Sequence, residues 1–421
     1  MENTRNTNYF FTPGKLTFLL DGGAGSSGKG KMASFIMKHA DNWTFACNTF
    51  FPQASHTVVD DGISYIYKQL NSCAHFIKGT GKVIYIGQGS VISLEALKKE
   101  LEMTGLDNTQ VKVHPMCGIV QDIDRLYEEG KLMFDGETKG NHSGTIKKGS
   151  TCSGVGATRA RKALRHPKML YAGDIDWLQP YLCDVEKEIT TRLMAGESGL
   201  CEIAQGYQLS VGLTKFKGFT TSRNCTVAAA LDDMMLPPAF AGNVVINFRT
   251  FPIRIHSNKY LSTDGSERHM TWQEVQDGEE GVDYTVIESP SGPGYEDQEE
   301  ISWDELTALS GSPEPTMECT TLTKLPRRVF TFSVDNLLDS ILANFPTEGH
   351  KVFIAVNFIN YLDNKITDSK DNGDLNELTE NWIGVNIRNP LIGYYAKADR
   401  IGDKLLLGTG ADTESVIVTD L

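Results

Sequence analysis

The sequence lacks the features on which disulfide-stabilised, zinc-binding and membrane-spanning proteins depend. Its eight cysteines in 421 residues are scattered, without a C-x-x-C pair or nearby histidine pairs, which argues against a disulfide scaffold and against a zinc site. No apolar run approaches the roughly 18 residues that a membrane span needs. Pro13, Gly14 and Lys15 interrupt the apolar residues near the start, so no export signal is indicated. We therefore expect a soluble, unexported protein of a reducing cytoplasm.

Positive charge is also in short supply. The chain has 40 Lys and Arg against 54 Asp and Glu, a net charge of -14 at pH 7 and a pI near 5.2. A protein that follows a nucleic-acid backbone needs clustered positive charge, so this balance argues against a nucleic-acid partner. It fits small anionic substrates that are bound locally.

The hydrophobic residues, 40% of the chain, are enough for one large core and come in short runs. Runs at 15–20, 43–48, 83–86, 244–247 and 351–357 have the length of buried strands, and helical patterns lie at 29–40 and 93–104. This alternation predicts an α/β fold with a large, mostly parallel central sheet flanked by helices. Acidic residues, glycine and proline accumulate from 262 to 315. We expect a single domain, 1–421, with an acidic surface insertion at about 262–315.

The most informative segment is glycine-rich and runs from Asp21 to Lys31, between a predicted strand and a predicted helix. Glycines let backbone N–H groups turn toward an anion, the helix adds its positive dipole end, and Lys29 adds a point charge, as in a phosphate-binding loop. Gly23 to Lys29 satisfies G-x-x-x-x-G-K, but Gly30 follows where such a loop ordinarily has the Ser or Thr that ligates magnesium. A glycine-rich turn without a ligand is the alternative.

A loop without that hydroxyl resembles the G-D-E-G-K-G-K loop of adenylosuccinate synthetases. Six further segments resemble motifs of that family in the same order along the chain, which chance does not easily produce. They lie at 52–57, 87–93, 149–156, 205–208, 221–226 and 321–328. The resemblance covers most of the chain and implies an adenylosuccinate synthetase-like fold, related to the P-loop NTPases, with surface excursions.

Synthetases of this family phosphorylate the 6-oxo oxygen of a purine nucleotide and then let the amine of aspartate displace the phosphate. The resemblance implies that loop amides, Lys29 and a magnesium ion neutralise the transferring phosphoryl group. It places His56 beside the oxygen as a general acid and gives the backbone carbonyl of Ser55 to the metal. Ser26 stands at the family's catalytic, metal-binding aspartate. The predicted catalytic residues are therefore Ser26, Lys29 and His56, and the predicted cofactor is Mg2+, with Ser26 and Ser55 as ligands.

The change at Ser26 bears on the substrate. The family's aspartate takes the proton from purine N1, which serine does poorly, and Ser27 replaces a neighbouring glutamate. Either the protein is a silent paralogue, or the lost carboxylates make room for the 2-amino group of guanine. The bacteriophage branch of the family, the 2-aminodeoxyadenylosuccinate synthetases, shows this aspartate loss and uses dGMP. The group that takes the N1 proton is left open; Asp21 could stand in, although bracing the loop is its favoured role.

The paired-arginine loop of the family changes in the same direction. Leu325 stands at an arginine that contacts the ribose hydroxyl and the aspartate, and a site with leucine there does not penalise a deoxyribose. Arginine's planar fork suits the carboxylates of aspartate, and threonine hydroxyls can add donors. The predicted aspartate-binding residues are Thr321, Thr323, Arg327 and Arg328. Solvation of the loop is the alternative role for the arginines.

The phosphate donor is predicted from Asn360, which stands where an aspartate of the family recognises guanine. An amide can match the donor and acceptor of adenine, so ATP or dATP replaces GTP as the expected donor. Asn360 could equally be a turn residue, and Phe358 could stack on the base. The predicted donor-binding residues are Gly25, Ser27, Gly28, Lys29, Gly30, Lys31, Thr57, Asn357, Phe358, Asn360, Gly408, Gly410 and Ala411.

The acceptor nucleotide is expected to be held by residues that match the family's contacts to the monophosphate and the base. These are Ser26, Gln53, Ser150, Thr151, Arg165, Gln208, Thr221 and Asn224. Arg165 matches an arginine that the partner subunit contributes in the family. The resemblance therefore implies a homodimer with active sites completed across the interface.

These inferences predict a ligase that uses ATP or dATP to join L-aspartate to dGMP through a 6-O-phosphorylated purine. The product would be N6-succino-2-amino-2'-deoxyadenylate, a step toward 2-aminoadenine DNA in the cytoplasm of a phage-infected cell. The alternative enzyme is a GTP-dependent adenylosuccinate synthetase that acts on IMP. The alternative of another class is a catalytically silent nucleotide-binding paralogue, against which the retention of Lys29, His56, Thr151, Arg165 and Arg327 argues.

Overall fold

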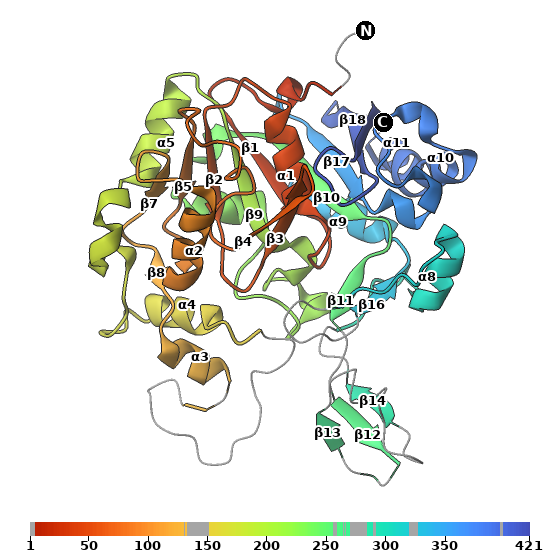
Figure 1. Ribbon diagram of the computed structural model, residues 1–421, viewed down its shortest axis with the longest axis horizontal. Helices are drawn as coiled ribbons and strands as arrows, with labels where there is room; N and C mark the ends of the chain where they lie inside the picture. The colour runs from red at the N-terminus through yellow and green to blue at the C-terminus, as the bar shows by residue number, and fades with distance from the viewer. Residues whose placement is uncertain are drawn as a thin grey trace.

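A nine-stranded sheet forms the centre of the molecule in the computed structural model (Figure 1). The structure describes residues 5–129, 131–132, 151–255, 259–263, 265, 267–269, 284–288, 292–319, 327–395 and 399–421. The strand order is β19-β18-β17-β10-β1-β9-β2-β5-β7, and all neighbouring pairs are parallel except β18 with β19. The strands are β1 (Leu16–Asp21), β2 (Phe45–Thr49), β5 (Val83–Ile86), β7 (Val111–Val113), β9 (Gly199–Gly206), β10 (Ala241–Arg249), β17 (Val352–Asn357), β18 (Ile401–Gly408) and β19 (Val416–Asp420).

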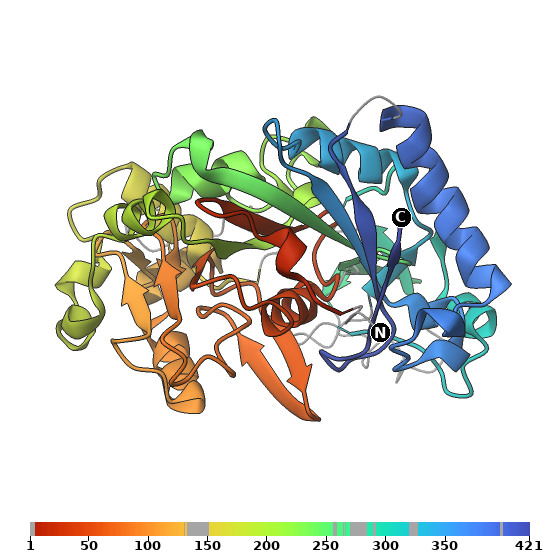
Figure 2. The same cartoon turned by 90° about the horizontal axis from the view of Figure 1, so that it is seen from above.

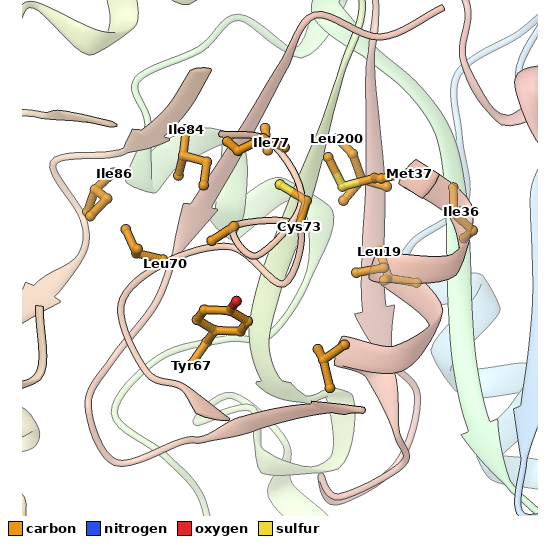
Figure 3. Close-up of a cluster of buried hydrophobic side chains, with 14 of the residues drawn as sticks. Leu19, Ile36, Met37, Tyr67, Leu70, Cys73, Ile77, Ile84, Ile86 and Leu200 are labelled. Carbon is orange, nitrogen blue, oxygen red and sulfur yellow. The ribbon is translucent and has the colours of Figure 1, made fainter. Parts of the chain in front are cut away.

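Helices cover both faces of this sheet (Figure 2). The α-helices of the described residues are α1 (Lys29–Lys38), α2 (Leu94–Thr104), α3 (Asp122–Glu128), α4 (Val155–Ala163), α5 (Val185–Met194), α6 (Val227–Asp233), α8 (Trp303–Ser310), α9 (Val334–Ala343), α10 (Glu377–Ile383) and α11 (Asn389–Tyr395), of which α3, α4 and α8 lie away from the central sheet in Figure 1. Because side chains alternate along a strand, Leu19 of β1 packs into one hydrophobic cluster and Phe18 into a second cluster on the other face. In Figure 3, Leu19, Ile36 and Leu200 lie within the first of these clusters. Burying apolar surface on both faces is the usual way in which a parallel sheet is stabilised.

Four smaller sheets accompany the central one. β3 (His56–Asp60) and β4 (Ile63–Tyr67) form an antiparallel hairpin, and β6 (Val91–Ile92) pairs with β8 (Gly118–Ile119). β16 (Arg327–Phe330) lies between β11 (Ile253–Ile255) and β15 (Glu300–Ile301). β12 (Lys259–Ser262) lies between β13 (Glu267–His269) and β14 (Tyr284–Glu288), apart from the central sheet in Figure 1.

The predicted elements that precede the candidate site are confirmed. All five apolar runs form strands of the central sheet, and the two helical patterns form α1 and α2. Ser93 caps α2, because its hydroxyl accepts a hydrogen bond from the backbone N–H of Ala96 at 3.4 Å. The single domain with an insertion at 262–315 stays a prediction; within that interval, α8 packs into a small core where Leu306 is fully buried. No helix in the described part of the chain has the length and apolar character needed to cross a membrane.

The parallel arrangement brings the ends of separate strands to one edge of the sheet. Asp21, at the end of β1, is in register with Gly206 of β9 and with Asn247 of β10, and Arg249 of β10 is in register with Asn357 of β17. Open α/β sheets bind ligands outside the carboxyl ends of their strands. The ends of β1, β9, β10 and β17, which border several of the segments predicted to bind the nucleotides, therefore meet at this edge.

Candidate active site

The glycine-rich loop between β1 and α1 is held by buried polar groups of the sheet. Asp21 accepts hydrogen bonds from the backbone N–H of Gly23 at 2.6 Å and from the hydroxyl of Ser27 at 2.5 Å. Asn247 donates from its Nδ2 to the backbone carbonyl of Ser27 at 2.8 Å. Burial raises the pKa of Asp21, and these hydrogen bonds oppose that rise. Asp21 therefore braces the loop, which is the role favoured from the sequence.

Asn357 extends this brace from the next strand. Its Nδ2 donates to the carbonyl of Ser27 at 2.9 Å and to Oδ1 of Asn247 at 3.0 Å. Gly28 has a φ of 77°, and a Cβ there would lie 2.9 Å from Nδ2 of Asn357, so a larger residue would be strained and would collide. The amide of Asn357, predicted to bind the donor, thus shapes the loop that would bind the phosphates.

Ser26 lies at the tip of the loop between two arginines. It has a left-handed φ of 55°, which is uncommon outside glycine. Its hydroxyl accepts a hydrogen bond from Arg327 at 2.6 Å, and its backbone carbonyl accepts one from Arg249 at 2.9 Å. Arg249 also forms an ion pair with Glu318 and lies over the ring of Phe358, 3.9 Å from the centroid. Two arginines thus surround Ser26, the position at which the resemblance expects an aspartate.

Lys29, His56 and Glu202 form a buried charged cluster beside the loop. Lys29 Nζ lies 3.1 Å from Oε1 of Glu202 and 3.0 Å from Nδ1 of His56, and the same Oε1 lies 2.8 Å from that Nδ1. Ser72 donates to Glu202 from its backbone N–H and from its hydroxyl, both at 3.1 Å. The His56 ring stacks on Phe50 with centroids 4.2 Å apart. The side chain that was predicted as the general acid is therefore held on two sides.

The short contact with a carboxylate favours one tautomer of His56. A proton on Nδ1 would be donated to Glu202 at 2.8 Å, whereas Lys29, 3.0 Å from the same nitrogen, opposes that proton. Burial lowers the pKa of His56, Lys29 lowers it further, and Glu202 opposes both, which leaves the imidazole neutral at pH 7. Burial alone would raise the pKa of Glu202, but Lys29 and His56 outweigh it, and that pKa lies below its usual value. With the proton on Nδ1, Nε2 of the neutral His56 is an acceptor.

The two arginines of β16 have different partners. Arg327 reaches Ser26, whereas Arg328 forks onto Glu300, with Nε–Oε1 and NH2–Oε2 distances of 2.8 and 2.6 Å. Adjacent residues of a strand point to opposite faces, which separates them. Of the two predicted aspartate-binding arginines, only Arg327 contacts the loop among the described contacts.

The predicted acceptor-binding residues lie on several segments. Gln53 Nε2 donates to the hydroxyl of Thr221 at 3.2 Å, which joins two of them. Arg254 donates to Oε1 of the buried Gln208 at 2.9 Å. Asn224 accepts the backbone N–H of Gly212, and Thr151 lies 2.7 Å from the hydroxyl of Ser153. Arg165, at the end of α4, is exposed and has a left-handed φ of 52°.

Several residues predicted to bind the phosphate-donor nucleotide lie near Lys31. Its Nζ donates to the carbonyls of Gly410 and Ser415, both at 2.7 Å, and so ties α1 to the segment between β18 and β19. A Cβ at Gly408 would lie 1.8 Å from Oδ1 of Asn357, so this position requires glycine. Other predicted donor-binding residues lie on three segments. Phe358 and Asn360 belong to the turn η7 (Ile359–Tyr361) and its N-cap, Thr57 belongs to β3, and Ala411 belongs to the 409–415 segment.

Comparisons with known proteins agree on one family. The family model for adenylosuccinate synthetase matches residues 23–175. The adenylosuccinate synthetase of Methanocaldococcus jannaschii is 30% identical over 246 residues, 58% of this chain and 67% of that protein. The chain belongs to the adenylosuccinate synthetase family.

Phage proteins of this family match over more of the chain. The N6-succino-2-amino-2'-deoxyadenylate synthase of Vibrio phage phiVC8 is 28% identical over 348 residues, which cover 80% of this chain and 84% of that protein. The succinoaminodeoxyadenylate synthetase of cyanophage S-2L, solved with dGMP and with dATP as an energy donor, has a TM-score of 0.66 at 24% identity, covering 96% of this chain and 94% of that one. Adenylosuccinate synthetase of Plasmodium falciparum has a TM-score of 0.68 at 15% identity, covering 96% of this chain and all of that one. These likenesses confirm the predicted adenylosuccinate synthetase fold.

Three residues that the sequence predicted for the site cannot be described, and one buried residue beside Lys29 and His56 was not predicted. Ser150, Thr321 and Thr323 lie outside the described residues. Glu202 was missed, although an acid inside the apolar strand β9 is a signal that it has a buried partner. Gln205, in the 205–208 segment, has a left-handed φ of 66°, a backbone strain that functional residues often carry.

Few side chains in the described part of the chain are available to bind a metal ion. Among the described residues no three His, Cys, Asp or Glu side chains form a group that could hold a metal. Asp21 is engaged by the loop, and the hydroxyl of Ser26 is engaged by Arg327. Because Mg2+ is commonly held by one or two protein oxygens together with substrate phosphates, this donor set fits only a metal that is bound mainly through the nucleotide.

Proposed function

We propose that this protein is a ligase that joins L-aspartate to dGMP, with ATP or dATP as the phosphate donor, to give N6-succino-2-amino-2'-deoxyadenylate. The observation that carries the proposal is the state of the loop. Ser26 and Ser27 replace two family carboxylates, and their hydroxyls are engaged by Arg327 and Asp21. No loop carboxylate is then left to crowd the 2-amino group of guanine. The phage relatives with this activity in their names support the same substrate.

The first chemical step transfers the terminal phosphoryl group of ATP or dATP to the 6-oxo oxygen of dGMP. The bond between the β- and γ-phosphates breaks, and the nucleoside diphosphate leaves. Lys29 and the N–H groups of the loop neutralise charge on the transferring group. Magnesium, held mainly by the phosphates and by the Ser55 carbonyl, would add further neutralisation, and Ser26 would join it only after its hydroxyl leaves Arg327. In the second step the amine of aspartate displaces the phosphate at C6, and Arg327 orients its carboxylates.

His56 supplies the base that the loop has lost. Its Nε2 takes the N1 proton as the 6-oxo oxygen is phosphorylated, and Glu202 stabilises the imidazolium that forms. That imidazolium then acts as the predicted acid toward the phosphorylated oxygen. One side chain thus serves in both directions, as a base and then as an acid.

The binding sites follow the predicted sets, with the changes of role described above. Gln53, Thr221, Gln208, Asn224 and Thr151 hold dGMP, and the amide of Asn360 matches adenine in the donor. Asn357 shapes the loop instead of touching the base. Arg165, exposed at the end of α4, completes the site of the partner subunit in a homodimer.

The test is a substrate matrix. The purified protein is incubated with Mg2+, L-aspartate, either dGMP or IMP, and ATP, dATP or GTP, and the succinylated nucleotide is detected by mass spectrometry. Product from dGMP with ATP or dATP is the expected result. Product from IMP with GTP alone would return the protein to ordinary purine synthesis, and no product in any well would leave a silent paralogue. Lys29→Met is the inactive control, and Lys98→Met, at an exposed lysine of α2, is its matched control.

A further inference from the structure

Two arginines flank one buried aromatic ring beside the proposed acceptor site. Arg159, on α4, has its guanidinium carbon 5.2 Å from the ring centroid of Phe51, and Arg223 lies 4.5 Å from the same centroid. Arg223 is only 4% exposed. Neither arginine is among the residues that the family resemblance assigned to a ligand.

These two arginines have more hydrogen-bond donors than partners. Arg223 uses NH1 for Thr49, at 2.9 Å, and for Asp233, but its Nε and NH2 are buried without a partner in the described part of the chain. NH1 of Arg159 is buried and unpartnered as well. A buried guanidinium with unused N–H groups is costly, since nearly all buried polar groups are hydrogen-bonded.

Charge is unbalanced in the same place. Asp233 is the main acid that acts on Arg159, while Arg223 repels it, and burial lowers the pKa of Arg159. Lys162 adds a third cation near the pair, with its Nζ held by the carbonyls of Gln88 and Met116. Two guanidiniums and one ammonium thus lie near two carboxylates, Asp233 and the more weakly acting Asp232, so positive charge is in excess. The environment suits a further anion.

The surrounding segments identify where that anion lies. Phe51 precedes Gln53 by two residues, and Arg223 follows Thr221 by two residues, and the side chains of Gln53 and Thr221 are joined at 3.2 Å. The helix that carries Arg159 begins just after Thr151. Gln53, Thr221 and Thr151 all belong to the set of residues proposed to hold dGMP.

The α4 N-terminus, which would be the usual place for a phosphate, is already in use. Glu128 accepts the backbone N–H groups of Gly154 at 2.8 Å and of Gly156 at 2.7 Å. A carboxylate of the chain itself therefore occupies the helix dipole end. A nucleotide phosphate in this region needs side-chain donors.

We propose that Arg159 and Arg223 form an arginine pair that binds the 5'-phosphate of the acceptor nucleotide from within the same subunit. The identity of that nucleotide rests on the proposed function, whereas the need for a phosphomonoester does not. The pair supplies paired N–H donors and charge where the loop and helix amides do not reach. A nucleoside without a phosphate gains nothing from it.

The experiment compares ligands with and without the phosphate by calorimetry. Wild type, Arg159→Met, Arg223→Met and the control Arg125→Met, which removes a partly exposed charge on α3, are titrated with dGMP and with 2'-deoxyguanosine. Loss of a hydrogen-bonded charge is expected to weaken dGMP binding by roughly 10- to 100-fold in the two site variants and by less than about 3-fold in the control. Binding of 2'-deoxyguanosine should change little in all of them.

Stability gives a second reading that a merely structural role would not produce. Arg159→Met removes a partly buried charge whose NH1 lacks a partner, so the ligand-free variant should melt at or above the temperature of wild type. A lower melting temperature with an unchanged Kd for dGMP would overturn the proposal, as would equal weakening of nucleotide and nucleoside. If Arg223→Met does not fold, Arg159→Met and Arg223→Lys carry the comparison.

The same titration separates this inference from the proposed function. If wild type binds IMP but not dGMP, the proposed substrate is wrong, and the comparison is repeated with IMP and inosine. A phosphate-dependent loss in Arg159→Met would then still support the arginine pair. No binding of either monophosphate by wild type would overturn both.

Discussion

At the scale of single residues, Glu202 shows how one side chain can set the chemistry of its neighbours. It is fully buried, accepts hydrogen bonds from Ser72, and lies within hydrogen-bond distance of both Lys29 and His56. A carboxylate in that place keeps the Nδ1 proton on His56 and stabilises the imidazolium when Nε2 gains a second proton. The proposed base therefore depends on an acid that does not itself touch the substrate.

Replacing this acid tests that dependence. Glu202→Gln should lower kcat by about 100-fold, the size of a typical acid–base contribution. Glu202 raises the pKa of His56, so its removal lowers that pKa, and the acid limb of the kcat/KM profile should move to lower pH. A pH-rate profile of both proteins measures the shift. An acid limb that stays in place or moves to higher pH would contradict the assignment of His56 as the base.

The two adjacent arginines of β16 provide a matched pair of variants. Arg327→Gln should raise the KM for aspartate by roughly 10- to 100-fold, because the lost donor is charged, and should change the KM for dGMP little. Arg328→Gln, which breaks the fork onto Glu300, should change both by less than about 3-fold. Steady-state kinetics with each substrate varied in turn decides the matter. Equal increases in the KM for aspartate in the two variants would show that Arg327 does not bind aspartate preferentially.

The sequence predicted part of this site and missed part of it for physical reasons. Lys29 and His56 were predicted because each belongs to a short motif whose residue spacing can be read directly from the sequence. Glu202 was missed because only the sheet brings it to them, from a strand far along the chain. Arg327 and Arg328 were treated as equivalent although the alternation of side chains along a strand separates them, a rule that the sequence alone could have supplied.

At the scale of elements, the contact between α1 and the segment before β19 depends on one buried amine. Lys31 is 4% exposed and donates to two backbone carbonyls. Burial lowers its pKa to about 7, an effect that Asp368 and Asp412 oppose. The unfolded chain, with a lysine pKa near 10.4, then binds more protons than the folded chain between pH 7 and 10.

This difference predicts a pH-dependent stability. Between pH 7 and pH 9, wild type should gain about 2 kcal/mol of unfolding free energy relative to Lys31→Met, which lacks the titrating group. Urea unfolding of both proteins at the two pH values gives the difference. A gap between the two proteins that is the same at pH 7 and pH 9 would show that the amine does not change its protonation in this range.

The elements themselves were predictable where a strand or helix is decided by its own residues. The buried runs of the central sheet and the capped helix α2 are of this kind. β10 is longer than the predicted run, since it extends from Ala241 to Arg249 with every residue buried. The polar residues Asn247 and Arg249 are accepted at its carboxyl end because they bond to the loop and to Glu318, which a reading of apolar runs does not detect.

At the scale of the whole molecule, the proposed homodimer makes two defective variants complementary. If Arg165 acts in the partner's site, a mixed dimer of Arg165→Ala and Lys29→Met contains one site with both defects and one with neither. An equal mixture that exchanges subunits should then recover about a quarter of the wild-type activity, although each variant alone is nearly inactive. Activity measured before and after subunit exchange checks this. A mixture that stays inactive after confirmed exchange would place Arg165 in the site of its own subunit.

The brace formed by Asn247 and Asn357 also has an evolutionary consequence. Asn357 donates to Asn247 while both amides hold the loop at Ser27, so the cost of losing one depends on whether the other is present. Substitutions at the two positions should therefore not accumulate independently during divergence. Where a descendant of this protein has replaced one asparagine, the second is released from selection, and the pair is expected to be inherited or lost as a unit.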